Sequence, residues 1–179
     1  DADTLRFNLQ IGQSGFQVPN TYDQIEKDQH QDIATFNIAP AYTRVMSSRS
    51  LFTANAFVRH DHLTFDPSAD PFNDTPATIS EDRSLTNGGI KADVSISAPR
   101  HTIKFGGGLS WTKLHEQFTL GITDPSDAAF AAEDGHFDPA LAPYDLTAGG
   151  TPLAYNQSDT IKEQSGYVQD TLTAGNATF

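Results

Sequence analysis

The feature that most constrains this chain is the period of two in its apolar residues. In residues 4–12, the apolar residues Leu5, Phe7 and Leu9 alternate with polar ones. Because successive side chains of a strand point to opposite faces, such a segment is a strand with one apolar face. The alternation recurs, less regularly in the last segment, in residues 34–43, 51–58, 88–96, 101–112 and 160–172. The sequence therefore predicts an all-β fold, an antiparallel up-and-down meander of about six strands.

The connections between these segments alternate strictly between short and long. The short ones are residues 44–50, 97–100 and 173–176. The long ones centre on residues 13–32, 66–82 and 124–150. A soluble sandwich keeps most of its hairpin loops short, whereas outer-membrane barrels have short turns at one end and long loops at the other. The spacing favours a segment of a transmembrane β-barrel, with residues 1–179 all part of one barrel domain.

Composition limits the partners and the chemistry that this chain can have. The net charge of −12 argues against a nucleic-acid partner, which requires a basic face. Since cysteine is absent, disulfides and thiolate metal sites are excluded. No Ser/His/Asp or paired-carboxylate constellation can be placed, so we expect neither an enzyme nor a cofactor site. No apolar run is long enough for a spanning helix, and barrel strands need only about 9–11 alternating residues.

Two stretches resemble barrel segments of TonB-dependent outer-membrane receptors: HTIKFGGGLSW at 101–111 and SGYVQDTLTAGNATF at 165–179. Members of that family have an N-terminal plug domain, a segment that binds the energy-coupling protein TonB, and a barrel of about 22 strands. The resemblance implies that this chain is an interior part of such a barrel, with the plug and the remaining strands outside it. We expect the strand that begins at Ala177–Phe179 to pair outside this sequence, because raw sheet edges are intolerable in hydrocarbon.

The same resemblance implies a location in the outer membrane of a Gram-negative-type bacterium. Its function would be energy-coupled uptake of a scarce solute, such as an iron chelate, cobalamin or an oligosaccharide. Its partners would be outer-membrane lipid, the plug, TonB through parts outside this chain, and the small-molecule substrate. Two alternatives remain open: a soluble β-sandwich that binds carbohydrate, and a non-transporting barrel that acts as an adhesin or structural protein.

The alternation also predicts what each side chain faces. We expect the apolar set to face lipid: Phe7, Leu9, Phe36, Ile38, Ala54, Val58, Ile90, Val94, Phe105, Leu109 and Trp111. The polar set should face the lumen: Arg6, Asn8, Thr35, Lys91, Asp93, Lys104 and Thr112. The face of Tyr167 is left open by the irregular last segment.

Local features qualify the strand assignments. Pro40 cannot donate to a ladder and predicts a bulge or break in the second strand. Asn87-Gly88 is a good hairpin turn and would add a small hairpin before the fourth strand. Consecutive strands should pair through turns near Met46, Pro99 and Gly175.

The longest loop carries the candidate ligand contacts. Between Lys113 and Lys162 the sequence has acidic residues but no Lys or Arg, and it has interspersed aromatic residues. Two interpretations remain open: a mobile acidic loop that only keeps the cell surface hydrated, and a partly ordered extracellular cap. In the second, the aromatic residues contact substrate or pack on neighbouring loops, and the carboxylates favour cationic or neutral ligands. The ligand-contact candidates are Phe118, Phe130, Phe137, Tyr144, Asp134 and Arg59.

Other groups with chemical potential are interpreted as structural. His60 and His62 share a strand face but should be polar rim residues and not metal ligands. Asp66, Asp70 and Asp74 lack the order of a calcium loop and are expected in plain turns. The glycines at 106–108 lack the lysine and helix of a phosphate loop, so they should mark a bend or the close approach of other backbone, such as that of a plug.

Overall fold

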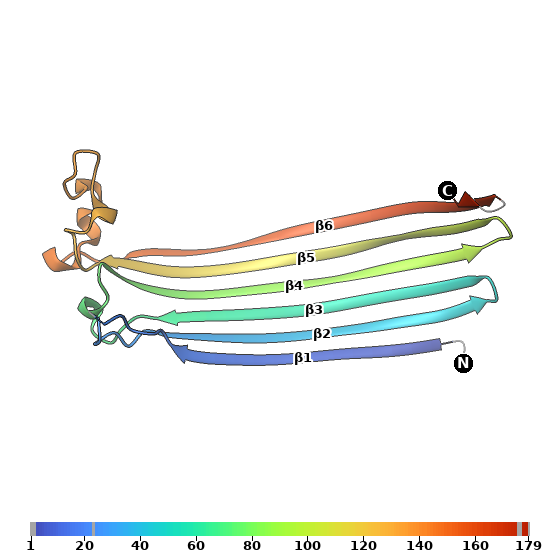
Figure 1. Ribbon diagram of the computed structural model, residues 1–179, viewed down its shortest axis with the longest axis horizontal. Coiled ribbons are helices and arrows are strands. Elements are labelled where there is room, and N and C mark those ends of the chain that lie inside the picture. Colours follow the sequence, from blue (N-terminus) through green and yellow to red (C-terminus); the bar gives the residue numbers. More distant parts are fainter. Residues whose placement is uncertain (1–2, 23, 175–176, 179) are drawn as a thin grey trace.

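The structure is a computed structural model that describes residues 3–22, 24–174 and 177–178. Its strands form a single antiparallel sheet, and neighbours in the sheet are neighbours in the chain (Figure 1). The strands are β1 (Asp3–Gln17), β2 (His30–Ser47), β3 (Ser50–Asp66), β4 (Ala77–Ser97), β5 (His101–Ile122), β6 (Leu153–Ala174) and β7 (Ala177–Thr178). The predicted all-β fold and the up-and-down meander are therefore confirmed.

The long and short connections lie at opposite ends of this sheet (Figure 1). The turn end has the tight hairpins β2–β3 and β4–β5 and the start of β7. At the β4–β5 turn, the Ala98 N–H donates to the His101 carbonyl at 2.7 Å, so this turn pairs its strands as expected. Gly175 lies outside the described residues, but Thr173 pairs with Thr178 on either side of it. The loop end has the connections 18–29, 67–76 and 123–152.

The strands extend much farther toward the loop end than the alternation predicts. β4 runs for 21 residues and β5 and β6 for 22 each. The prediction of a hairpin turn at Asn87-Gly88 is wrong. Gly88 is inside β4 and pairs with Val58 on one side and Trp111 on the other. The reason is packing, since a Cβ at Gly88 would collide with the indole ring of Trp111. The glycine makes room for a neighbour and does not form a turn.

Pro40 interrupts one ladder without shifting it. Its pairing with Phe7 of β1 is in continuous register. On the other side, the ladder with β3 is interrupted at Ala39 and Pro40. Ile38 pairs with Val58 before the interruption and Ala41 pairs with Asn55 after it, in the same register. The expected interruption is present because proline has no N–H to donate. The expected bulge is not at this site, since the register of β2 shifts between Val45 and Ser47.

The sheet has almost no core of its own. Among the described residues, Ile122 is the only buried hydrophobic side chain, and it lies where β5 ends under the longest loop. Large apolar side chains such as Leu5, Leu109 and Val168 are 74%, 62% and 80% exposed. Large contiguous exposed apolar surfaces mark sites of interaction with a partner or a membrane.

Candidate functional site

Register divides the sheet into two faces. Residues directly opposite each other in neighbouring strands project to the same side. One face, here called the tryptophan face, includes the row through Leu9, Ile38, Val58, Gly88, Trp111 and Lys162. The other, the tyrosine face, includes the row through Thr53, Asp93, Gly106 and Tyr167. Every residue expected to face lipid is on the tryptophan face, and every residue expected in the lumen is on the tyrosine face. Tyr167 joins the second group.

The two faces exchange their polarity part of the way along the strands. On the tryptophan face, apolar residues reach from the turn end up to Phe36 and Trp111, and polar residues follow to the loop end. That polar part includes Gln13, Gln17, His30, Asp32, His60, His62, Thr64, Ser80, Asp82, Ser84, Thr86, Lys113, His115, Gln117, Thr119, Asn156, Ser158 and Thr160. The tyrosine face does the reverse, with a polar turn-end half and a loop-end half rich in apolar residues.

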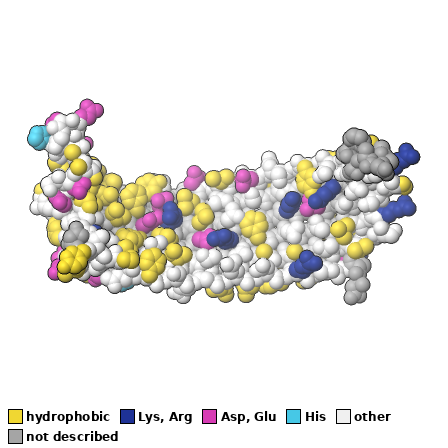
Figure 2. Space-filling model, viewed as in Figure 1, with side chains coloured by type: hydrophobic (Ala, Val, Ile, Leu, Met, Phe, Trp, Pro, Cys, Tyr) yellow, Lys and Arg dark blue, Asp and Glu magenta, His cyan; other side chains and the backbone are white. Residues whose placement is uncertain are grey.

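The apolar residues at the loop end of the tyrosine face form a second apolar surface. Phe118 and Tyr155 lie side by side there, with ring centroids 5.3 Å apart. Arg83 and Glu81 make an ion pair at 3.3 Å within this surface, and Glu81 lies in the row of Phe118 and Tyr155. Figure 2 shows hydrophobic side chains gathered toward the loop end of the face in view, with basic and acidic side chains farther along, a distribution that matches the tyrosine face. The other apolar members are Phe16, Ile33, Leu63, Phe65, Ile79, Leu85, Leu114, Leu120 and Leu153.

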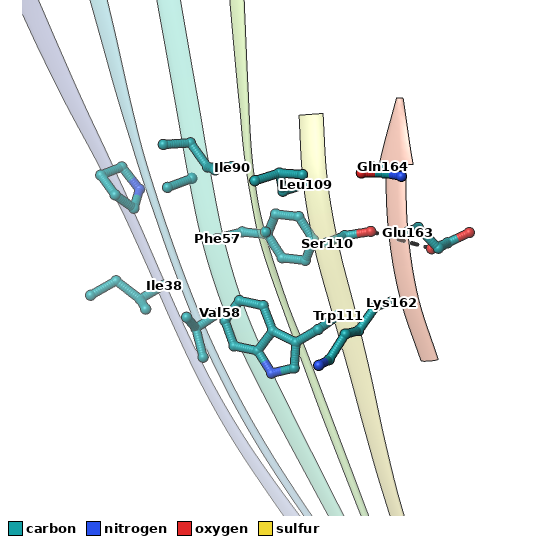
Figure 3. A pocket seen from close by; sticks show the side chains of 13 residues that line it. Ile38, Phe57, Val58, Ile90, Leu109, Ser110, Trp111, Lys162, Glu163 and Gln164 are labelled. Atoms are coloured by element: carbon teal, nitrogen blue, oxygen red, sulfur yellow. Dashed lines mark hydrogen bonds between the residues drawn. The ribbon is translucent and has the colours of Figure 1, made fainter. Parts of the chain in front are cut away.

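The apolar part of the tryptophan face has the height of a membrane band. From Ile103 to Trp111, β5 extends about 27 Å at about 3.4 Å per residue. With a barrel tilt of about 35–45°, that stretch is about 20 Å tall, close to the band of about 25 Å in outer-membrane barrels. β6 is the exception, since Lys162 and Gln164 occupy this face opposite Trp111 and Leu109. Where β6 meets the band there is a hollow of about 860 Å³ whose wall includes these four side chains (Figure 3).

Phe118, one of the ligand-contact candidates, is in a strand and not in the longest loop. The loop was expected between Lys113 and Lys162, but β5 continues to Ile122 and β6 begins at Leu153. The reason is the exchange of polarity: alternation persists beyond Lys113, but its apolar members have moved to the other face. Arg59 is also on the tyrosine face, in β3, and its Nε lies 2.8 Å from the Asp61 carboxylate.

The longest loop, residues 123–152, is folded and not extended. It contains the 3₁₀ helices η2 (Ala128–Phe130), η3 (Pro139–Tyr144) and η4 (Leu146–Ala148). Each begins at an aspartate side chain that accepts a backbone N–H bond: Asp127 from Ala129, Asp138 from Ala140 and Asp145 from Thr147. Much of the acidity of this loop therefore serves helix capping.

Three contacts anchor this loop to the sheet end. Leu146 packs closely on Gly121: a Cβ added to Gly121 would lie 2.7 Å from the Leu146 Cδ1 atom. The Thr123 N–H donates to the Pro76 carbonyl at 3.0 Å, and its hydroxyl donates to the Asp74 carbonyl. The Asp74 carboxylate is fully buried and accepts bonds from Ser68 and Thr78. The order expected of a cap is thus present in this loop.

The remaining ligand-contact candidates lie in this loop but do not form one cluster. Phe130 ends η2 and Tyr144 ends η3, both half-buried. Phe137 lines a hollow of about 680 Å³ whose wall also includes Asp127, His136 and Asp145. Asp134 is exposed and accepts the His136 N–H at 3.0 Å. Neither Arg59 nor Phe118 lines that hollow.

Asp124, at the start of the loop, has a perturbed carboxyl group. Its Oδ1 accepts the Ser126 hydroxyl at 2.6 Å and the Ser126 N–H at 3.0 Å. These bonds favour the ionised form and hold the pKa of Asp124 below its usual value.

A polar cluster on the tyrosine face joins Tyr167, whose face the sequence left open, to residues that were expected in the lumen. The Tyr167 hydroxyl donates to Asp93, and Thr53 donates to the same carboxylate at 3.4 Å. Lys91 Nζ lies 5.5 Å from the centroid of the Tyr167 ring, on the same face as Lys104 at 5.9 Å. The hydrogen bond between Tyr167 and Asp93 passes over Gly106, which lies between them in the sheet. A Cβ added to Gly106 would lie 2.6 Å from the Ala92 carbonyl oxygen. At Gly106 the space is therefore taken by a side-chain contact, whereas the sequence predicted a bend or the close approach of other backbone at residues 106–108.

The histidines and acidic turns have structural partners. His60 bonds Thr86 at 2.8 Å, and His62 bonds Asp82 at 2.9 Å. Asp70 caps the short helix η1 (Pro71–Asn73) through the Phe72 N–H. Within the described ranges, no three His, Cys, Asp or Glu side chains converge as a metal site would require.

Comparison with known proteins identifies no matching family model, no similar curated protein and no similar solved structure. In the part of the chain that the structure describes, no helix is both long enough and apolar enough to cross a membrane.

Proposed function

We propose that this chain is a segment of a TonB-dependent receptor barrel in the outer membrane, which takes up a scarce solute by energy coupling. The observation that supports this most is the exchange of polarity between the two faces near the row of Trp111. In this proposal, the turn-end half of the strands crosses the membrane, with its apolar face on lipid and its polar face on the lumen.

Beyond that row the strands rise above the membrane. The tryptophan face then meets water and is polar, while the tyrosine face lines a vestibule with apolar and aromatic side chains. A sheet of a soluble sandwich buries one face over its whole length, so its polarity does not exchange at one height. The exchange therefore favours the barrel over the carbohydrate-binding module.

The edges of the sheet fit the same proposal. The outer edge of β1 and most of the outer edge of β6 have no partner strand within the described residues. Each unpaired N–H or C=O group costs on the order of several kcal/mol in hydrocarbon. We infer that further strands close the barrel on both sides and that a plug fills its lumen.

Substrate recognition belongs at the loop end in this proposal. Phe118 and Tyr155 offer aromatic surface on the vestibule wall, and Phe137 lines the hollow of the longest loop. The carboxylates of this loop favour cationic or neutral ligands over anionic ones. Iron chelates, cobalamin and oligosaccharides are the candidate solutes.

Nitroxide labels test which face meets lipid. In the whole protein in its membrane, a label at Val94 should be relaxed by oxygen, and a label at the adjacent Asp93 by a water-soluble nickel complex. The reverse pattern would contradict the assignment of the faces. Aqueous exposure of both labels would contradict the membrane location and favour the soluble sandwich.

A second measurement separates a transporter from a structural barrel. Cells that express the protein should accumulate the radiolabelled solute, and this should stop when the proton gradient is collapsed. An intact, lipid-facing barrel without such uptake would leave the adhesin or structural alternative.

A further inference from the structure

The row of Trp111 also marks a change in charge on the tryptophan face. In this row and the next two toward the loops, every ionisable side chain is basic. They are His60, His62, Lys113, His115 and Lys162, here called the basic belt. The nearest acids of this face, Asp32 and Asp82, lie one row farther toward the loops. This is unexpected by composition, because acidic residues outnumber Lys and Arg by 23 to 11 in the whole chain.

The two lysines of the belt are available to an external partner. Lys113 and Lys162 are exposed, and in the described part of the chain neither has a carboxylate within 4.0 Å. By contrast, the histidines bond Thr86, Asp82 and Ser158 within the sheet. The lysines are thus the free cations of the belt.

The position of the belt points to its partner. It adjoins the upper rim of the apolar band, beside Trp111, and tryptophan favours the level of the lipid head groups. Lys162 lies next to the indole (Figure 3). A lysine at this level buries its aliphatic stem against the band and directs its ammonium group outward.

We propose that the basic belt binds anionic head groups of the outer-leaflet lipids and thereby fixes the height of the protein in the membrane. This inference rests on the proposed membrane location. Each lysine near an anionic surface should raise the association constant for an anionic lipid about fivefold over a zwitterionic one.

Trp111 is the only tryptophan of this chain and reports on the belt directly. The whole protein, with its other tryptophans replaced by phenylalanine, is reconstituted in vesicles that contain brominated phosphatidylglycerol or brominated phosphatidylcholine. Quenching of Trp111 should show about fivefold or greater preference for the anionic lipid. Lys113→Gln/Lys162→Gln should abolish this preference, and Lys113→Arg/Lys162→Arg should keep it.

Lys91→Gln/Lys104→Gln is the matched control, since it removes equal charge from the tyrosine face and should leave the preference unchanged. Equal quenching by both lipids in the wild type, or loss of preference in the control, would overturn the basic belt alone. Absence of quenching by either lipid would place Trp111 away from the bilayer and overturn the proposed membrane location as well.

Discussion

At the scale of single residues, glycines decide which side chains can cross from strand to strand. Gly88 is covered by the Trp111 indole, and Gly106 lies under the contact between Tyr167 and Asp93. Both glycines are inside strands, where glycine normally weakens a sheet because it has no side chain to pack. Here the absent side chain admits a larger one from the next strand.

Gly106→Val tests this role. The new side chain would meet the Asp93 carboxylate and the Ala92 carbonyl, so Tyr167 could no longer reach its partner. Overpacking of this kind costs about 1–3 kcal/mol. Gly12→Val is the control, because nothing lies within 4 Å of a Cβ at Gly12. Urea unfolding of the whole protein in detergent should show a lower free energy for Gly106→Val only, and equal effects would contradict the role of Gly106.

Asp124 makes the start of the longest loop sensitive to acid. Its pKa is lower in the folded chain than in the unfolded one, because the Ser126 hydroxyl and N–H stabilise the carboxylate. Its contribution is therefore fully present above about pH 4 and is lost as pH falls through the lowered pKa. Amide exchange at Ser126 should accelerate as pH falls below this point, beyond the intrinsic pH effect. Asp124→Asn should show fast exchange at neutral pH already, and slow exchange in that variant would refute the assignment.

At the scale of elements, the turn-end halves of the strands were predictable and the loop-end halves were not. Alternation in segments such as residues 101–112 assigns both the strand and its faces, because the residues on each side keep one polarity. Beyond Trp111 the polarity of the faces is exchanged, so the apolar series is displaced by one residue. Such a displacement in a sequence is indistinguishable from the end of a strand, which is why Phe118 was placed in a loop.

The candidate site was less predictable than the fold. The aromatic residues of the longest loop were identified by composition, and the 3₁₀ helices that position them follow from aspartate capping, which short sequence patterns do not separate from plain turns. The contact between Tyr167 and Asp93 joins residues 74 apart in sequence, and no local pattern relates them. Conversely, the turn chemistry of Asn87-Gly88 was overridden by pairing with strands on both sides.

The longest loop can be tested as an element because its anchors lie near its ends. Deleting residues 126–142 removes η2, Phe137 and Asp134 but keeps Thr123, Asp145 and the Leu146 contact with Gly121. If the loop binds substrate, the affinity of the whole protein should fall at least about tenfold while the barrel keeps its heat-resistant mobility on gels. Unchanged affinity in an assembled barrel would assign the loop to surface hydration only.

At the scale of the whole molecule, the exchange of polarity fixes how deep the protein would lie in a membrane. The apolar rows of the tryptophan face have their middle near Ala92 and Gly107, with the Trp111 row above and the Ile103 row below. The midplane should therefore pass within one row of Val94. Polar rows of the same face, such as that of Ser84, would lie above the lipid.

An arginine scan along β4 measures that depth. Val94→Arg should make folding into vesicles less favourable by about 2–4 kcal/mol, because a charge near the midplane loses its hydration. Ser84→Arg, on the same face but above the band, should cost about 0–1 kcal/mol. Ser95→Arg, next to Val94 but on the tyrosine face, should also cost little, since that face meets the aqueous lumen. Equal costs for Val94→Arg and Ser84→Arg would mean that no lipid boundary lies between the two rows, and a larger cost for Ser95→Arg would mean that the faces are reversed.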